Sequence, residues 1–221
     1  KSTLFNNLMG ILKSTEGEIL YNGEQIKYDK KSLYNLRKEV GIVFQDPEKQ
    51  IFYSMVYDDI AFALRNIGMD EKTIKDRIHT ALEAVNGLQF IDRPVHNLSF
   101  GQKKRVAIAS VVAMENKLVL LDEPTAGLDP ISTRAIVDII KGLNDRGVKI
   151  IISSHDMNLI YEICDYVYVL NQGVLINEGT RAEVFVNEEK INEAGLELPW
   201  LVKLHKNMGL PLFPKEEDLY S

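Results

Sequence analysis

Apolar residues recur at two spacings along the chain, one typical of helices and one typical of strands. Between Lys1 and Leu12 they fall three and four positions apart, which predicts the first turns of an amphipathic helix. From Gly17 to Ile26 they alternate with polar residues around an Asn22-Gly23 pair, which predicts a hairpin strand and its turn. Val40–Gln45 has the apolar character of a short strand that ends in polar residues.

The segment from Asp46 to about Ser99 has a different pattern, with helical periodicity and little strand signal. Two amphipathic stretches, Gln50–Asn66 and Glu71–Val85, are separated by Gly68. We interpret the segment as a helical lobe inserted into an α/β core.

Beyond this lobe, helical and apolar strand patterns alternate. The predicted helices are Gln102–Met114, Pro130–Asn144 and Met157–Cys164, and the predicted strands are Leu118–Asp122, Lys149–Ser153 and Tyr166–Asn171. Such alternation indicates a parallel sheet covered by helices on both faces. Ligands of such a sheet are expected at the carboxyl ends of its strands.

The remaining pattern is less regular. Gly173–Glu178 predicts a last hairpin strand, and a helix is expected to start near Arg181. The tail from Val186 to Ser221 contains Pro199, Pro211 and Pro214 and is predicted to be irregular. We expect Trp200 and Leu201 to be buried within it.

The composition of the chain bears on its partners and on its cellular compartment. The 221 residues hold 26 Lys+Arg and 32 Asp+Glu, a net charge of −6, with 45% apolar residues, as in an ordinary globular protein. The negative charge and the lack of a basic patch argue against a nucleic-acid partner. The one cysteine, Cys164, suits a reducing compartment, so the cytosol is the default location. No run approaches the ~18 consecutive apolar residues that span a bilayer, so a function at a membrane would need other subunits to provide the membrane-spanning segments.

Two short motifs are candidates for phosphate chemistry. Lys1-Ser2-Thr3 matches only the final third of a phosphate-binding loop, so we expect the chain to begin inside that motif. Alone, so short a motif fits a solvated helix start better. The acids Asp122 and Glu123 follow an apolar strand, and side chains alternate faces there. Asp122 could therefore face hydrated Mg²⁺ and Glu123 an attacking water, unless the two acids simply solvate the strand end.

A third motif begins the helix that leads to the acidic strand. Ser99 and Gln102 have the spacing of a capping box, and Gly101 allows close backbone approach. A helix start of this kind is a natural anion site, although the motif alone also fits a well-capped helix.

The motifs and their order resemble the ATP-binding-cassette (ABC) ATPases. They are Lys1-Ser2-Thr3, Gln45, Ser99-Phe100-Gly101-Gln102, Asp122-Glu123, Ala126-Gly127-Leu128-Asp129 and His155. The resemblance covers residues 1–185 and implies an α/β P-loop NTPase core with a mostly parallel sheet, an antiparallel β-subdomain and an α-helical subdomain at about 46–99. It implies that this domain lacks its N-terminal strand and Gly-rich loop here, and that 186–221 form a C-terminal extension.

The resemblance also implies roles for individual residues at ATP and Mg²⁺. Lys1 would bind the β/γ-phosphates, Ser2 would coordinate Mg²⁺ and Thr3 would bind the α-phosphate. Gln45 would reach both Mg²⁺ and the attacking water.

The acidic strand and the loops after it complete the implied site. Asp122 would hold Mg²⁺, Glu123 would polarise the water and His155 would contact the γ-phosphate. A head-to-tail second subunit, identical or related, would supply Ser99, Gly101 and Gln102 to the nucleotide, and Asp129 would signal across that interface.

Asp46-Pro47-Glu48-Lys49-Gln50-Ile51-Phe52 resembles a segment of the energy-coupling-factor branch of this family, and the run from Phe100 to Ala109 is similar to its cobalt importers. This implies a peripheral ATPase on the cytoplasmic face of the cell membrane, with integral coupling and substrate-binding subunits. Ile51, Phe52, Tyr53 and Met55 would seat a coupling helix, or else form lobe core. The alternatives are an ATPase of another vitamin importer of this branch, a non-transport ABC ATPase, or a module that binds ATP without splitting it.

Overall fold

The computed structural model describes residues 1–220. Its chain divides into two compact units, Ser2–Ser153 and a second unit formed by Lys1 and the chain from Ser154 onward.

A three-stranded parallel sheet forms the centre of the Ser2–Ser153 unit, in the order β3-β4-β5. The strands are β3 (Val40–Val43), β4 (Leu118–Asp122) and β5 (Lys149–Ser153). The register pairs Val43 with Leu121 and Asp122 with Ser153. Because the strands are parallel, their carboxyl ends meet at one edge, as the sequence predicts.

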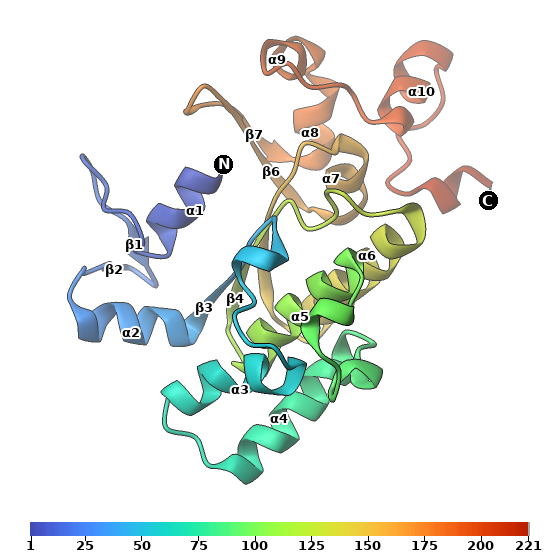
Figure 1. Cartoon of the computed structure of the whole chain (residues 1–221). Coiled ribbons are helices and arrows are strands. Elements are labelled where there is room, and N and C mark those ends of the chain that lie inside the picture. The colour runs from blue at the N-terminus through green and yellow to red at the C-terminus, as the bar shows by residue number, and fades with distance from the viewer. Residues whose placement is uncertain (221) are drawn as a thin grey trace. The chain divides into compact units, whose positions relative to one another are not determined.

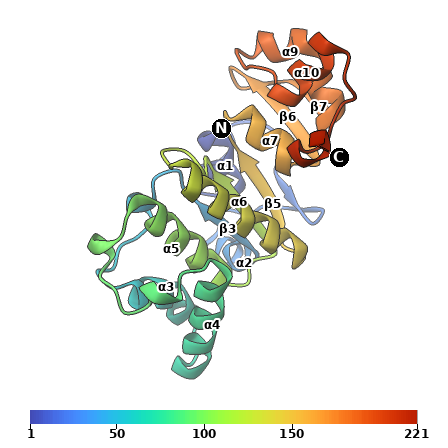
Figure 2. The same cartoon turned by 90° about the vertical axis from the view of Figure 1, so that its right-hand side faces the viewer.

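Helices cover both faces of this sheet (Figures 1 and 2). Helix α1 (Ser2–Leu8) packs against β4, while α5 (Phe100–Ala113) packs against β3 and α6 (Pro130–Asp145) against β5. Phe5 of α1 belongs to a buried cluster with Leu36, Val40 and Leu120. This packing brings the start of α1 towards the strand ends.

A small hairpin and a helix connect α1 to the sheet. The hairpin pairs β1 (Leu20–Tyr21) with β2 (Glu24–Gln25), and α2 (Lys30–Glu39) leads directly into β3. Helix α1 is shorter than the predicted Lys1–Leu12, because the chain turns at Gly10 with a φ of 63°. The predicted hairpin and its Asn22-Gly23 turn are confirmed.

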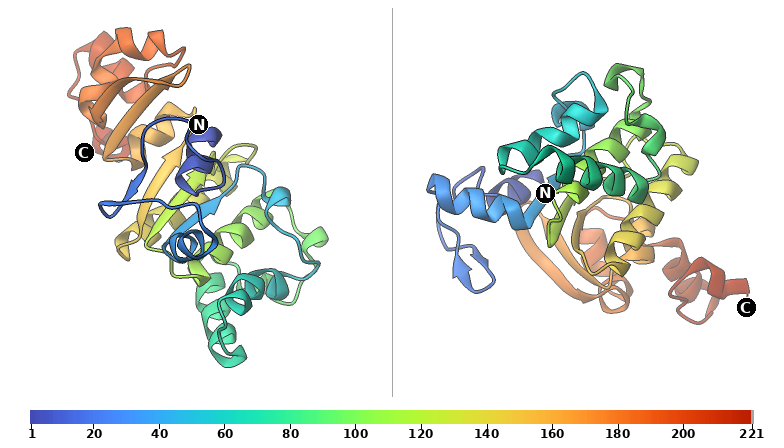
Figure 3. Two further views of the ribbon diagram at one scale, coloured as in Figure 1. Left: turned by 90° about the vertical axis from the view of Figure 1, so that its left-hand side faces the viewer. Right: turned by 90° about the horizontal axis from the view of Figure 1, so that it is seen from below.

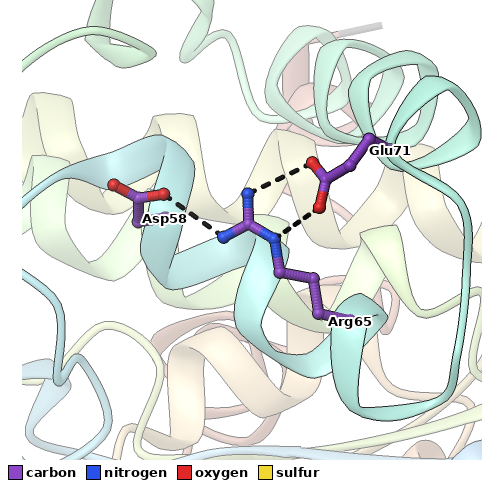
Figure 4. A network of polar contacts seen from close by, with 3 residues as sticks. All are labelled: Asp58, Arg65 and Glu71. Atoms are coloured by element: carbon purple, nitrogen blue, oxygen red, sulfur yellow. Dashed lines mark hydrogen bonds and ion pairs between the residues drawn. The ribbon is translucent and has the colours of Figure 1, made fainter.

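The two helices predicted between Asp46 and Ser99 are also present. This segment contains 3-10 turns at Pro47–Lys49, Leu88–Phe90 and Val95–Asn97, and the helices α3 (Val56–Asn66) and α4 (Glu71–Ala84). These helices pack on α5 through side chains with no exposed surface, among them Ile60, Leu64, Ile74 and Ile78. On the outside, Arg65 binds Asp58 of its own helix and Glu71 at the start of α4 (Figure 4).

The second unit is built on an antiparallel hairpin of β6 (Tyr166–Asn171) and β7 (Val174–Thr180). Its other elements are α7 (Met157–Ile163), α8 (Arg181–Val186), α9 (Glu188–Glu193), α10 (Trp200–Met208) and a 3-10 turn at Glu216–Tyr220 (Figure 3). Two predictions are wrong here. The tail is mostly helical, and β6 pairs with β7 instead of joining the parallel sheet.

The reasons for both errors lie in local chemistry. Pro199 stands at the N-cap of α10, where a proline does not interrupt a helix. Strand β6 alternates exposed Tyr166 and Tyr168 with buried Val167 and Val169, the pattern of a strand covered on one face. Leu201 is buried as expected, whereas Trp200 is only half-buried.

Candidate functional site

The carboxylate of Asp122 is held between two serine hydroxyls at the carboxyl ends of the strands. Ser2 Oγ, at the start of α1, donates a 2.6 Å hydrogen bond to Asp122 Oδ2. Ser153 Oγ, at the end of β5, donates a 2.6 Å hydrogen bond to Asp122 Oδ1. Asp122 is only 4% exposed. The arrangement concentrates hard oxygen donors at one point, the donor type that Mg²⁺ prefers.

Glu123 follows directly and is also buried, with 7% of its surface exposed. Its φ of 46° lies in the left-handed region, which is uncommon for a residue with a side chain. Its N–H donates to the Ser153 carbonyl at 2.9 Å, and its carbonyl accepts from the Ala126 N–H at 3.2 Å. These bonds hold the turn that follows β4 and carries the glutamate.

Helix α5 begins with the predicted capping box. Ser99 Oγ accepts from the Gln102 N–H at 3.3 Å, and Gln102 Oε1 accepts from the Ser99 N–H at 2.9 Å. A Cβ at Gly101 would meet Ser132 Oγ at 3.1 Å, so the glycine allows close packing on α6. Ser99 itself is exposed. The helix start is therefore ordered and open to a ligand from outside the unit.

Asp129 caps α6, which begins at Pro130. Its carboxylate accepts from the Ser132 N–H at 2.9 Å and from the Ser132 hydroxyl at 2.6 Å. These hydrogen bonds lower the pKa of Asp129, so it stays ionised well below neutral pH. Because Gly101 packs on Ser132, the capped starts of α5 and α6 lie together.

Lys104 is the buried cation nearest these elements. It is 1% exposed, and its Nζ donates to the carbonyls of Glu123 at 2.7 Å and Pro124 at 2.9 Å. Burial lowers the pKa of its ammonium group to about 8, against the attraction of Glu123, Asp122 and Asp46. The lysine thus fastens α5 to the backbone beneath the two acids.

Gln45 is exposed just after β3, in a loop with several internal bonds. Asp46 accepts from the Glu48 N–H at 3.0 Å, and Gln50 Oε1 accepts from the Phe44 N–H at 3.0 Å. Glu48 also forms an ion pair with Lys103 of α5. The loop is therefore tied back to β3 and to the helix that starts at the capping box.

A surface groove of about 400 Å³ opens beside this loop, and we call it the lobe groove. Its lining residues are Glu48, Ile51, Phe52, Tyr53, Ser54, Val95, His96 and Lys103. Phe52 is 79% exposed and Tyr53 43% exposed, so these aromatics are not lobe core. Met55 is not among the lining residues and bridges instead to Pro94.

Asp59 fixes the aromatic side of the lobe groove. Its Oδ1 accepts from the N–H groups of Phe52 at 2.8 Å and Tyr53 at 3.1 Å. Burial raises the pKa of this carboxyl group, while the two N–H donors oppose the rise.

The structure thus brings together part of the predicted site. Ser2 and Asp122 are in contact, and Glu123 adjoins them through the Ser153 carbonyl. Thr3 is exposed on α1. Lys1 and His155 belong to the second unit, and their roles at the phosphates stay predictions.

Three polar residues of this region had no predicted role. Ser153 was visible only as the polar end of an apolar strand, and Asp59 as one of several acids in a helix. Lys104 stood in a basic run, Lys103-Lys104-Arg105, that gave no sign of which cation is buried.

The chain is similar to known ATP-binding proteins of transporters. The family model described as ABC transporter matches residues 1–126. The cobalt import ATP-binding protein CbiO of Salmonella typhimurium is 49% identical over 220 residues, which cover 100% of this chain and 81% of the relative. The energy-coupling factor transporter ATP-binding protein EcfA of Methanocaldococcus jannaschii is 48% identical over 204 residues, 92% of this chain and 73% of the relative.

Solved structures give the same pattern. CbiO1 from Clostridium perfringens, described as part of the ABC transporter complex cbiONQ, aligns with a TM-score of 0.78 and 43% identity over 93% of this chain and 82% of that one. A dimeric post-hydrolysis state of the ATP-binding cassette MJ0796, bound to ADP and Pi, aligns with a TM-score of 0.73 and 26% identity over 81% and 80%. Within residues 1–220, no helix has the length and apolar character required to cross a membrane.

Proposed function

The chain belongs to the family of ABC transporter ATPases, and from this premise we propose that it is the ATP-hydrolysing subunit of an energy-coupling-factor importer for cobalt or another transition metal. The observation that carries the ATPase proposal is the Asp122 carboxylate, held at the strand ends between Ser2 and Ser153 with Glu123 beside it. The cobalt proposal rests on the 49% identity to CbiO.

We infer that nucleotide phosphates and Mg²⁺ bind where α1 meets the strand ends. Ser2 and Asp122 would hold Mg²⁺, with Gln45 reaching it from its loop, and the ion would neutralise phosphate charge. Lys1 would bind the β/γ-phosphates and Thr3 the α-phosphate. The Ser2–Asp122 hydrogen bond supports this assignment, because two oxygens already in contact are the hard donors that Mg²⁺ takes.

Glu123 would orient the water that attacks the γ-phosphate, aided by Gln45 and His155. The buried, left-handed turn at Glu123 supports this role, since sparsely populated backbone conformations cluster at active sites where the surroundings hold them. Hydrolysis of a phosphoanhydride depends mainly on positioning and on electrostatic stabilisation. A fixed Glu123 carboxylate beside the phosphates would supply the positioning.

A second subunit would complete each site. The exposed Ser99 turn, with Gly101 and Gln102, presents helix N–H groups to an anion, and Asp129 caps the neighbouring helix. A head-to-tail pair, identical or related, would place this turn on the nucleotide held by the partner's phosphate loop. The neighbour that was solved as a dimer bound to ADP and Pi supports the pairing of two cassettes.

The lobe groove would receive an integral membrane subunit, with the ATPase held peripherally on the cytoplasmic face. Its exposed aromatic residues, fixed by Asp59, fit the apolar face of a short helix. The Glu48–Lys103 ion pair joins this groove to α5, so docking and nucleotide closure act on the same helix.

A phosphate-release assay on the full chain tests the enzymatic part. We expect turnover that depends on ATP and Mg²⁺, and we expect Glu123→Gln to abolish it while sparing ATP-driven dimerisation. A Glu123→Gln variant with parental turnover would contradict the role of Glu123. A chain that binds ATP without releasing phosphate would be a regulatory module instead.

Co-purification tests the transport part. Membrane subunits recovered with the chain, and the solute that they accumulate in vesicles, separate a cobalt importer from a vitamin importer. Recovery of no membrane subunit, with turnover intact, would favour a non-transport ABC ATPase.

A further inference from the structure

Lys104 occupies a position in which an apolar residue would normally be expected. It lies on α5 between buried residues, with 1% of its surface exposed. An ammonium group is strongly disfavoured in such a place unless hydrogen bonds compensate for lost water. Here two carbonyl groups do so, those of Glu123 and Pro124. The two carbonyl groups therefore explain why a lysine is found at this buried position.

The backbone that Lys104 binds is the turn that carries the glutamate. Glu123 has a φ of 46°, and such conformations persist only where the surroundings over-determine them. The bonds to Ser153 and Ala126 fix this turn from the sheet side and from within. Lys104 fixes the turn from the helix side, because its ammonium group donates to the main-chain carbonyl oxygen of Glu123 itself.

The helix that carries Lys104 begins at the Ser99 turn, which would face the phosphates of the partner's nucleotide. Lys104 stands in the second turn of the helix that the Ser99 capping box begins. The Ser99 cap and Lys104 therefore belong to one continuous hydrogen-bonded helix. The chain thus contains a direct link from the turn that would meet the partner's nucleotide to the backbone of its own glutamate.

We propose that Lys104 is a positioning residue, which ties the start of α5 to the main chain of Glu123 and so sets the position of that carboxylate. This inference rests on the proposed ATPase function of Glu123. It predicts that loss of the two hydrogen bonds lowers the rate of hydrolysis more than it weakens ATP binding, because the Lys104 ammonium binds the main chain that carries Glu123.

The test compares Lys104→Met, which loses the donors, with Lys104→Gln, which has the same reach as methionine and keeps an N–H donor. Val106→Ala is the matched control, since Val106 is fully buried two residues further along α5 and its side chain has no hydrogen-bonding atom. Steady-state kcat and KM for ATP, melting temperature and ATP-driven dimerisation are measured for each full-chain variant.

For Lys104→Met we expect kcat to fall about tenfold or more, with KM within about threefold of the parent. Lys104→Gln should recover part of the loss. Val106→Ala should lower the melting temperature and keep kcat within about twofold of the parent. Equal kcat in Lys104→Met and Val106→Ala, or a rise in KM with unchanged kcat, would overturn the proposal.

Two further outcomes are decisive. If Lys104→Met does not fold, Lys104→Gln takes its place, and we expect kcat reduced about threefold or more because the shorter side chain reaches fewer carbonyls. Parental kcat in Lys104→Gln would then overturn the proposal. If the parent does not hydrolyse ATP, or Glu123→Gln is fully active, the proposed function fails and this inference fails with it.

Discussion

Replacement of Ser153 by alanine tests the proposed role of Asp122 as a magnesium ligand. The Ser153 hydroxyl donates a 2.6 Å hydrogen bond to one carboxylate oxygen, while Ser2 donates to the other. Asp122 is 4% exposed, so bulk water has little access to the oxygen that loses its donor. The change therefore leaves a buried carboxylate with half of its hydroxyl support.

The size of the effect follows from this geometry. A hydrogen bond to a charged group contributes about 1.5–3 kcal/mol, which corresponds to roughly 10- to 150-fold in an equilibrium constant. Loss of an outer partner of a metal ligand lowers metal affinity by about 10- to 100-fold. We therefore expect Ser153→Ala to raise the apparent dissociation constant for Mg²⁺ by about 10- to 100-fold, with activity recovering at high Mg²⁺.

The assay is the steady-state ATPase rate as a function of free Mg²⁺ at saturating ATP. Ser153→Thr keeps the hydroxyl and should retain most of the parental Mg²⁺ affinity. Ser110→Ala is the control, because the Ser110 hydroxyl donates to the Val106 carbonyl of its own helix. If Ser153→Ala needs no more Mg²⁺ than the parent, the Ser153 hydroxyl does not position Asp122 and the reasoning is refuted.

Three other predictions test separate parts of the molecule. Ser99→Arg should bind ATP normally but lose ATP-dependent dimerisation, and light scattering that still shows a dimer would exclude the Ser99 turn from the interface. Burial raises the pKa of the Cys164 thiol to about 11, so iodoacetamide at pH 8 should alkylate it roughly a hundredfold more slowly than in the urea-unfolded chain, and equal rates by mass spectrometry would contradict this. Gly41→Ala would press a methyl group against Val111 and Asn116, so calorimetry should show a loss of about 1–3 kcal/mol of stability, whereas an unchanged melting temperature would mean that α5 yields easily.

Much of the fold was predictable because local and tertiary signals agree. Strand β4 is a run of apolar residues that is buried almost throughout, and its predicted bounds are those observed. The tail was harder to predict, because its helices are short and owe their order to contacts made across the chain. One such contact joins the Trp200 N–H to Asn158 Oδ1 at 2.9 Å, and another joins the Tyr161 hydroxyl to the Phe213 carbonyl at 3.0 Å.

The site was predictable only where a residue type carries the chemistry. Asp122 and Glu123 were candidates because acids after a buried strand are chemically distinctive, and their roles stay predictions. Ser153 and Lys104 form hydrogen bonds with partners 31 and 19 residues away, and nothing in their spacing marks those bonds. A lysine in a basic run is usually exposed, so the burial of Lys104 had to come from the packed structure.

The geometry around Asp122 depends on the register between two apolar strands. Asp122 pairs with Ser153 only because Leu120 and Leu121, both without exposed surface, pair with Ile151 and Ile152. A slip of one residue would turn every side chain of a strand to its opposite face and separate the carboxylate from the hydroxyl. The hydrophobic free energy that fixes this register therefore also holds Asp122 between its two serines. Core substitutions at Leu120 or Leu121 should consequently alter the Mg²⁺ dependence of the ATPase, although neither side chain reaches the site.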